Sequence, residues 1–269
     1  MKTMKQAEFK KAIAGLPLEK SAYFASIGST NDVVAEWARE GAKGLCLAFA
    51  NEQTSGRGRA GRHWVTPPGS ALAFSLLLDF APSFDQSLLG RVSGLGALAV
   101  CEALENLYQL APQIKWPNDV LLEGKKVCGV LPETHWSGEH LQALILGIGI
   151  NVAPSSVPIQ EALNFPATSV EDVLKRRVNF GRLLRATLGR LLGWKDLLES
   201  PEFKKAWEQR LAYRGEVVRL ESSQGEMVEA ELHSLAADGS LKLRMQNGDL
   251  RTFQGSEIQL RPLIDSRTK

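Results

Sequence analysis

The sequence predicts an α/β protein with a large N-terminal part, built of buried strands and helices, and a small C-terminal part built of strands. Its length of 269 residues suits one large domain and one small domain. Continuous apolar runs at 45–50 and 71–78 are typical of strands that are buried on both faces. Beyond Arg214 the helical patterns give way to short strand-like runs. We therefore expect two domains, over 1–213 and 214–269.

The elements of the N-terminal part follow from periodicity and turn signals. Residues 1–16 carry apolar side chains at helical spacing, and Ser29 caps a second helical pattern that stops at Gly41. The two apolar runs then supply strands. Further on, strands are expected at 114–116, 120–122, 127–131 and 140–152, and helices at 86–107 and across 179–212.

The C-terminal part reads as a small barrel. Strand-like runs at 217–221, 227–235, 241–245 and 250–254 are separated by turn signals, among them Asp238-Gly239 and Asn247-Gly248. Asp-Gly and Asn-Gly favour hairpins because both central residues tolerate a positive φ. Roughly fifty residues of short strands fit a barrel of SH3-like size.

Composition narrows the class of protein. The formal net charge is only +2, so bulk electrostatics gives no support for a nucleic-acid binder. The three cysteines lie in apolar runs without a C-x-x-C pair, which suits buried thiols in a reducing compartment, and the four histidines lack metal-ligand spacing. No apolar run approaches the length of a membrane span and no signal core begins the chain. We expect a cytoplasmic protein without a membrane partner.

The most informative stretch is 56–64, Gly-Arg-Gly-Arg-Ala-Gly-Arg-His-Trp, which we call the arginine loop. Glycine lets backbone N–H groups approach an anion, arginine adds planar donors, and Trp64 adds an aromatic face. The loop is therefore expected to bind a negatively charged ligand with a flat ring. The G-x-G-x-x-G match to a dinucleotide site is weak, because 51–55 separates it from the strand and Pro67-Pro68 forbids a following helix. A solvated basic loop is the bland alternative.

Further segments join the arginine loop in a fixed order. Each segment alone has an ordinary structural explanation, since Ser-Thr-Asn is usually a helix cap and Asn-Asp is usually a turn. They are Ser29-Thr30-Asn31, Gln53, Lys115-Trp116-Pro117-Asn118-Asp119, Lys126-Val127-Cys128-Gly129 and Gly149-Ile150-Asn151. Together, from about Ser29 to Asn151, they resemble the biotin–protein ligases, which attach biotin to a carrier lysine.

The charges suit that chemistry. Activating a carboxylate with ATP brings like charges together, so cations must neutralise them, and adenylation needs positioning and electrostatics more than a nucleophile. A Walker-type phosphate loop and a Ser-His-Asp signature are both missing from the sequence. The available cations are Arg57, Arg59, Arg62, Lys115 and Lys126.

The resemblance implies roles for matching residues. Ser29, Thr30 and Gln53 would bind the ureido ring of biotin, the Arg57-Gly58-Arg59 backbone would close over the ligand, and Lys126 would hold the carboxyl end. Asn31 and Gly129 would also belong to the biotin site. The ATP contacts would be Arg59, Arg62, Trp64, which would stack on adenine, Asn118, Asn151 and Arg261, the last in the terminal motif Gly255-Ser256-Glu257-Ile258-Gln259-Leu260-Arg261. The catalytic set would be Arg59, Lys115, Lys126 and Asp119. Whether Asp119 contacts magnesium or deprotonates the incoming lysine stays open, and the metal ligands are unknown.

The implied protein is a monofunctional ligase with a class II synthetase-like α/β catalytic domain, a mixed sheet and an SH3-like barrel. It would use biotin, ATP and Mg²⁺, form biotinyl-5′-AMP and modify a lysine of a biotin carboxyl carrier protein. A lipoate–protein ligase and a non-catalytic biotin sensor are the alternatives.

About 28 residues precede Ser29, too few for a DNA-binding helix-turn-helix domain, so DNA is not an expected partner. A homodimer is among the open oligomeric states. Pro132 is expected to end its strand or to lie at a sheet edge.

Overall fold

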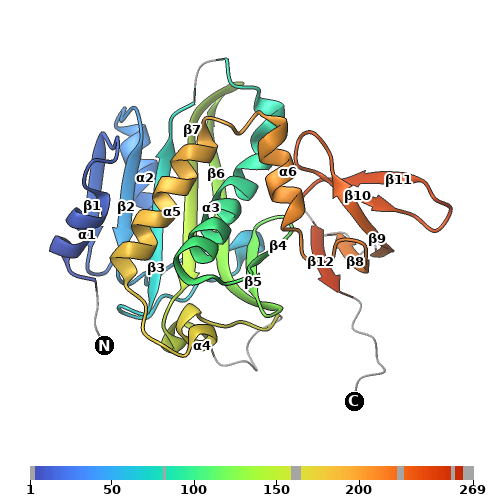
Figure 1. Cartoon of the computed structure of the whole chain (residues 1–269). Coiled ribbons are helices and arrows are strands. Elements are labelled where there is room, and N and C mark those ends of the chain that lie inside the picture. The colour runs from blue at the N-terminus through green and yellow to red at the C-terminus, as the bar shows by residue number, and fades with distance from the viewer. Residues whose placement is uncertain (1–3, 81–82, 159–164, 223–226, 256–257, 263–269) are drawn as a thin grey trace.

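A computed structural model describes residues 4–80, 83–158, 165–222, 227–255 and 258–262. Its larger part is built on a seven-stranded sheet in the order β1-β2-β3-β7-β6-β5-β4 (Figure 1). Only β1 and β2 are parallel, so the sheet is mixed, as predicted. The strands are β1 (Lys20–Phe24), β2 (Cys46–Ala50), β3 (Ala71–Leu78), β4 (Gln113–Lys115), β5 (Asp119–Leu122), β6 (Lys125–Ser137) and β7 (His140–Asn151).

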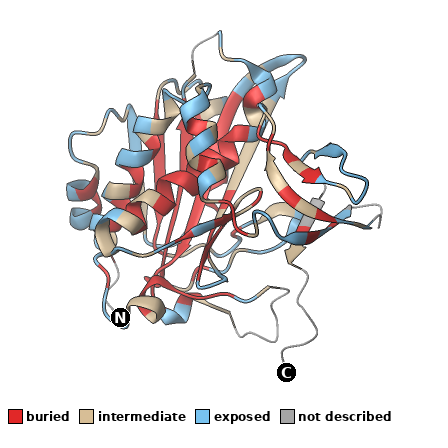
Figure 2. Ribbon diagram, turned by 45° about the vertical axis from the view of Figure 1, so that its right-hand side comes forward, coloured by how far each residue is buried: buried red, intermediate tan, exposed pale blue. Residues whose placement is uncertain are grey.

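Helices cover both faces of this sheet. On one face α3 (Arg91–Tyr108) packs on β4 to β7, and α5 (Phe180–Lys195) lies on α3. On the opposite face α2 (Thr30–Arg39) packs on β2, β3 and β7. The central strands β2 and β3 are buried along their whole length, and β7 is buried from Ala143 on (Figure 2). The remaining helices are α1 (Gln6–Ile13), α4 (Val170–Leu174) and α6 (Pro201–Gln209).

The helical segment 86–108, a 3₁₀ turn followed by α3, is long and apolar enough to cross a membrane by composition, which the sequence analysis overlooked. Most of it is buried between the sheet and α5, as in the core helix of a globular domain. Two glycines allow this close packing. A methyl group at Gly94 would overlap the Trp207 indole, and one at Gly96 would press on Val130.

The C-terminal strands form a second, five-stranded sheet in the order β11-β10-β9-β8-β12. Two buried polar contacts join it to the larger part. The Trp116 indole N–H donates to the Gly239 carbonyl at 2.9 Å, and Arg91, 5% exposed, donates through Nε to the Ala237 carbonyl at 2.6 Å. The strands are β8 (Val217–Ser222), β9 (Met227–Leu235), β10 (Leu241–Arg244), β11 (Leu250–Phe253) and β12 (Ile258–Pro262).

The structure corrects the expected elements in a few places. The strand does not end at Pro132, because β6 runs on to Ser137 and pairs with β7 over this stretch. The alternative, an edge position, is confirmed, since β5 pairs with β6 only as far as Gly129. Pro132 therefore has a neighbouring strand on one side, which tolerates its missing N–H. Sequence patterns also missed β1, β12 and α4. In β1 the cause is its edge position, where half-exposed residues give no continuous apolar run.

Candidate active site

A pocket of about 510 Å³ opens between α2, the arginine loop, the β4–β5 turn, β6, β7 and β12. It brings together every site residue that the sequence analysis named. These residues are Ser29, Thr30, Asn31, Gln53, Arg57, Gly58, Arg59, Arg62, Trp64, Lys115, Asn118, Asp119, Lys126, Gly129, Asn151 and Arg261.

The arginine loop folds back on itself at the mouth of the pocket. Gly58 N–H donates to the Arg62 carbonyl at 2.6 Å, and Trp64 N–H donates to the Gly56 carbonyl at 2.9 Å. A short 3₁₀ turn joins them, with Ala60 and Gly61 at positive φ. No helix opens after the glycines within this fully described segment, so the dinucleotide alternative is wrong.

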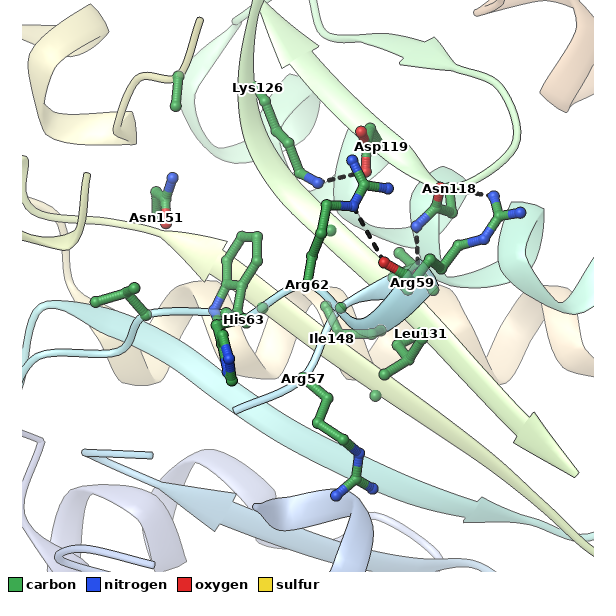
Figure 3. A pocket seen from close by; sticks show the side chains of 18 of the residues that line it. Arg57, Arg59, Arg62, His63, Asn118, Asp119, Lys126, Leu131, Ile148 and Asn151 are labelled. Carbon is green, nitrogen blue, oxygen red and sulfur yellow. Dashed lines mark hydrogen bonds and ion pairs between the residues drawn. The ribbon is translucent and has the colours of Figure 1, made fainter. Parts of the chain in front are cut away.

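Arg57 joins the arginine loop to α2 and β6 through two ion pairs. Its Nη1 lies 2.7 Å from an Asp32 oxygen on α2, and its Nη2 lies 3.2 Å from Glu133 on β6. Figure 3 shows its guanidinium turned away from Lys126, Asp119 and Arg62. The side chain therefore fixes the loop, and only the Arg57 backbone remains to face a ligand.

Three positions of β7 form the pocket floor. Gly147, Gly149 and Asn151 alternate along the strand and so point to one face. A methyl group at Gly147 would overlap the Asn31 amide, and one at Gly149 would overlap the Trp64 indole. Both glycines therefore provide the space in which other site residues lie.

The end of the pocket near Gly147 is polar and uncharged. Gln53 Oε1 accepts from the Thr30 backbone N–H at 2.8 Å and lies 3.0 Å from the Thr30 hydroxyl. Gln53 thereby satisfies the Thr30 N–H, one of the unpaired donors in the first turn of α2. Ser29 occupies the predicted N-cap position, but its side chain makes no capping hydrogen bond there.

Positive charge collects around one buried carboxylate at the other end. Lys126 Nζ lies 2.6 Å from Asp119 Oδ1 (Figure 3). Lys115 Nζ lies 4.0 Å from Asp119 Oδ2. Burial alone would raise the pKa of Asp119, but the two lysines outweigh it and lower that pKa. Burial lowers the pKa of Lys115 to about 8, against the attraction of Asp119. Asp119 is therefore ionised at neutral pH.

Arg59 connects the two sheets at this site. Its guanidinium donates to Asn118 Oδ1 at 3.2 Å and to the Gly255 carbonyl of the C-terminal part. Asn118 in turn donates to the Val130 carbonyl at 2.7 Å. Arg261 of β12 also lines the pocket, and its charge adds to the lowering of the Lys115 pKa. Ser256 and Glu257 of the terminal motif lie outside the described residues.

The described residues do not form a metal cage. They contain no group of three or more His, Cys, Asp or Glu side chains with metal-binding geometry. Asp119 is the one carboxylate among the described pocket residues, and it is already paired with Lys126. Five cationic side chains share the pocket with it, namely Arg59, Arg62, Lys115, Lys126 and Arg261. The protein side of this site fits polyanions rather than a resident cation.

Sequence reasoning missed several pocket residues, chiefly Ser75, Gly147 and Phe165. Ser75 lies fully buried in β3 and contacts Thr30 and Asn31. The signal was present, since Ser75 is the one polar residue in the run 71–78. Phe165 gave no signal; its ring lies 4.8 Å from Lys115 Nζ.

Comparison with known proteins identifies the family of this chain. The profile of the Biotin/lipoate A/B protein ligase family matches residues 23–151. The biotin–[acetyl-CoA-carboxylase] ligase of Paracoccus denitrificans is 35% identical over 185 residues, covering 66% of this chain and 75% of that protein. The bifunctional ligase/repressor BirA of Bacillus spizizenii is 33% identical, and the match spans 57% of this chain and 46% of that relative, less than half its length.

Solved structures extend the likeness to the C-terminal part. The biotin protein ligase of Aquifex aeolicus, determined with biotin and ATP, superposes with a TM-score of 0.74 at 29% identity. The superposition covers 91% of this chain and all of that one. Together with the Paracoccus relative and the family profile, it places this chain among the biotin protein ligases of the biotin/lipoate A/B protein ligase family.

Proposed function

We propose that this ligase binds biotin along β7, activates it with ATP as biotinyl-5′-AMP and transfers the biotinyl group to a lysine of a biotin carboxyl carrier protein. One observation carries the proposal: a single pocket has an uncharged polar end at Gly147 and a strongly cationic end at Lys126. Biotin has the matching polarity, with a neutral cyclic urea at one end and a carboxylate at the other. The names of the Paracoccus and Aquifex relatives agree.

Electrostatics supports the first half-reaction. A biotin carboxylate oxygen attacks the α-phosphorus of ATP, and pyrophosphate leaves with the electron pair of the broken P–O bond. Carboxylate and triphosphate repel each other, so cations placed in advance lower the barrier. We assign Lys126 to the carboxylate and Arg59, Arg62 and Lys115 to the phosphates, and we place Arg261 on the nucleotide. Mg²⁺ would enter on the phosphate oxygens of ATP, where it neutralises charge.

The second half-reaction moves the biotinyl group to an amine. The neutral ε-amine of the carrier lysine attacks the acyl carbon, the C–O bond to AMP breaks, and the amine gives up a proton. Asp119 is a poor acceptor for that proton, because its two lysine neighbours keep its pKa low. We therefore assign Asp119 to positioning Lys126 rather than to general-base catalysis.

The remaining nucleotide contacts are also proposals. Trp64 would stack on adenine, and it is partly exposed over Gly129 and Gly149. Its indole N–H is buried without an acceptor among the described residues, as expected for a donor that a ligand satisfies. Asn118 and Asn151 already donate to the Val130 and Thr168 carbonyls. They would therefore contact the nucleotide through their oxygens or by packing.

The domain assignment follows the same proposal. We take 1–213 as the catalytic domain and 214–269 as the SH3-like domain, because α6 is the last element of the first part and the second sheet starts with β8. The absence of DNA binding stays a prediction, and a homodimer stays one of the open oligomeric states.

Adenylate formation tests the activity against its nearest alternative. The full chain is incubated with ATP, Mg²⁺ and either biotin or lipoate, and the acyl adenylate is detected by mass. Biotinyl-5′-AMP should form with biotin, and lipoyl-AMP should be at least about tenfold slower to form, because the polar end has no partner in a dithiolane ring. Preference for lipoate would make this chain a lipoate ligase. Biotin binding without adenylate would make it a sensor.

A further inference from the structure

The uncharged end of the pocket depends on Ser75, the buried polar residue that interrupts the apolar strand β3. Ser75 Oγ lies 2.7 Å from the Thr30 hydroxyl and donates to Asn31 Oδ1 at 2.5 Å. All three side chains are nearly inaccessible, with Ser75 at 0%, Thr30 at 3% and Asn31 at 3% exposure. One strand hydroxyl therefore holds two successive residues of the first turn of α2.

Hydroxyl and amide chemistry limits the proton arrangement in this cluster. An amide oxygen can only accept, so the single Ser75 proton serves Asn31. The single Thr30 hydroxyl proton has two acceptors within reach, Ser75 Oγ at 2.7 Å and Gln53 Oε1 at 3.0 Å, and Gln53 Oε1 also accepts the Thr30 backbone N–H at 2.8 Å. In either arrangement Thr30 Oγ1 keeps a lone pair that can accept from a ligand. Asn31 is left with its NH₂ group as a donor.

That donor lacks a partner among the described residues. Asn31 Nδ2 is buried without an acceptor, although Asn31 lines the pocket. Native proteins rarely leave buried donors unpaired, because desolvation without a hydrogen bond is costly. Opposite Ser75 in the sheet lies Gly147, where a methyl group would overlap Asn31 Oδ1. Gly147 thus makes the room that lets Asn31 reach Ser75 in this orientation.

We infer that Ser75 is a positioning residue for substrate selection, which presents Thr30 as an acceptor and Asn31 as a donor to the cyclic urea of biotin. The inference rests on the proposed function. A urea offers an N–H donor beside a C=O acceptor, so it satisfies both groups. A dithiolane ring offers neither, and its binding would leave the Asn31 amide buried and unpaired. Ser75 acts through its neighbours and does not enter the reaction.

The test compares ligands that keep or lack the urea. Dissociation constants of biotin, desthiobiotin, which keeps the urea, and lipoic acid, which lacks it, are measured by calorimetric competition for wild type and Ser75→Ala. We expect Ser75→Ala to weaken biotin and desthiobiotin by about 10- to 100-fold and lipoic acid by less than about threefold. A role in folding alone would weaken all three ligands equally.

Ser70→Ala is the matched control, since Ser70 is equally buried and donates to the Pro67 carbonyl at 2.7 Å outside the pocket lining. It should leave all three constants within about threefold. Should Ser75→Ala fail to fold, Ser75→Cys, nearly isosteric with a weak hydrogen-bonding group, is expected to show the same selective loss.

Parallel losses for all three ligands, or a loss below about threefold for biotin, would overturn the role of Ser75. In that case the proposed function still stands if the wild-type protein binds biotin more tightly than lipoic acid. A wild type that binds lipoic acid at least as tightly as biotin contradicts the proposed function itself.

Discussion

The ammonium of Lys126 lies 2.6 Å from the carboxylate of Asp119, and this pair is three-quarters or more buried at the cationic end of the pocket. Removing one partner of a buried ion pair leaves an uncompensated charge and costs more than the pair contributes. Asp119 therefore holds in place the lysine that we assign to the biotin carboxylate.

Asp119→Asn is expected to slow adenylate formation by about 10- to 100-fold, because Lys126 loses its fixed position. Single-turnover measurement of pyrophosphate release checks this. A general base of the second step would behave differently: adenylation would stay near wild type, and only transfer from pre-formed adenylate to the carrier would slow. That pattern would restore the base role.

Lys115 should take up a proton when ATP binds in alkaline solution. Its pKa of about 8 leaves most of it neutral at pH 9, and the negative phosphates should raise that pKa and recharge it. At pH 6.5 it is already charged, so no uptake is expected from this group. Calorimetry of ATP binding in buffers of different ionisation enthalpy measures the uptake, and Lys115→Arg, which is charged at both pH values, should abolish it. Equal uptake at both pH values would contradict the assignment.

Arg57 should control how long biotin stays bound. It joins the arginine loop to Asp32 and Glu133, and such part-exposed pairs contribute roughly 0.2–1 kcal/mol each. Glu133→Ala should therefore raise the biotin dissociation rate by about two- to fivefold, with a smaller effect at high salt. Glu36→Ala is the control, since it breaks a surface pair with Arg39 on the same α2. Stopped-flow displacement would refute this role if both variants behaved alike.

Arg261→Ala should raise the ATP concentration needed for adenylation while leaving biotin binding in the absence of ATP near wild type. Arg261 is delivered from β12 into a pocket otherwise built by the larger part, and a guanidinium suits phosphate or ribose. ATP titrations of pyrophosphate release check the first effect. Wild-type ATP dependence would remove Arg261 from the site.

The sequence predicted the buried strands and a set of residues that line one pocket, the strands from local apolar runs and the residues from the arginine loop and the resemblance to the biotin–protein ligases. The roles of these residues stay predictions. Runs such as 71–78 are typical of buried strands, and the arginine loop has a composition that solvation does not require. The contacts between side chains could not be predicted from the sequence, because they depend on tertiary packing. Arg57 was expected near the ligand, yet its side chain turns outward to Glu133, which is 76 positions away in the chain.

Ser75 and Ser29 illustrate the same limit at single positions. Ser75 was treated as part of an apolar run, although a hydroxyl in a buried strand needs a hydrogen-bond partner and so indicates a polar neighbour. Ser29 occupies the predicted N-cap position without a capping hydrogen bond, while Gln53 from another segment accepts the Thr30 N–H. Such a contact between distant segments cannot be predicted before the two segments meet in space.

Transfer to the carrier tests the central claim most directly. The full chain is mixed with biotin, ATP, Mg²⁺ and a biotin carboxyl carrier domain, and the intact mass of the carrier is followed with time. We predict a gain of one biotinyl group on the acceptor lysine, dependent on both biotin and ATP, and a rate lowered by about 10²- to 10³-fold in Arg59→Ala. A carrier whose mass stays unchanged while the wild-type protein forms biotinyl-5′-AMP would contradict the ligase account.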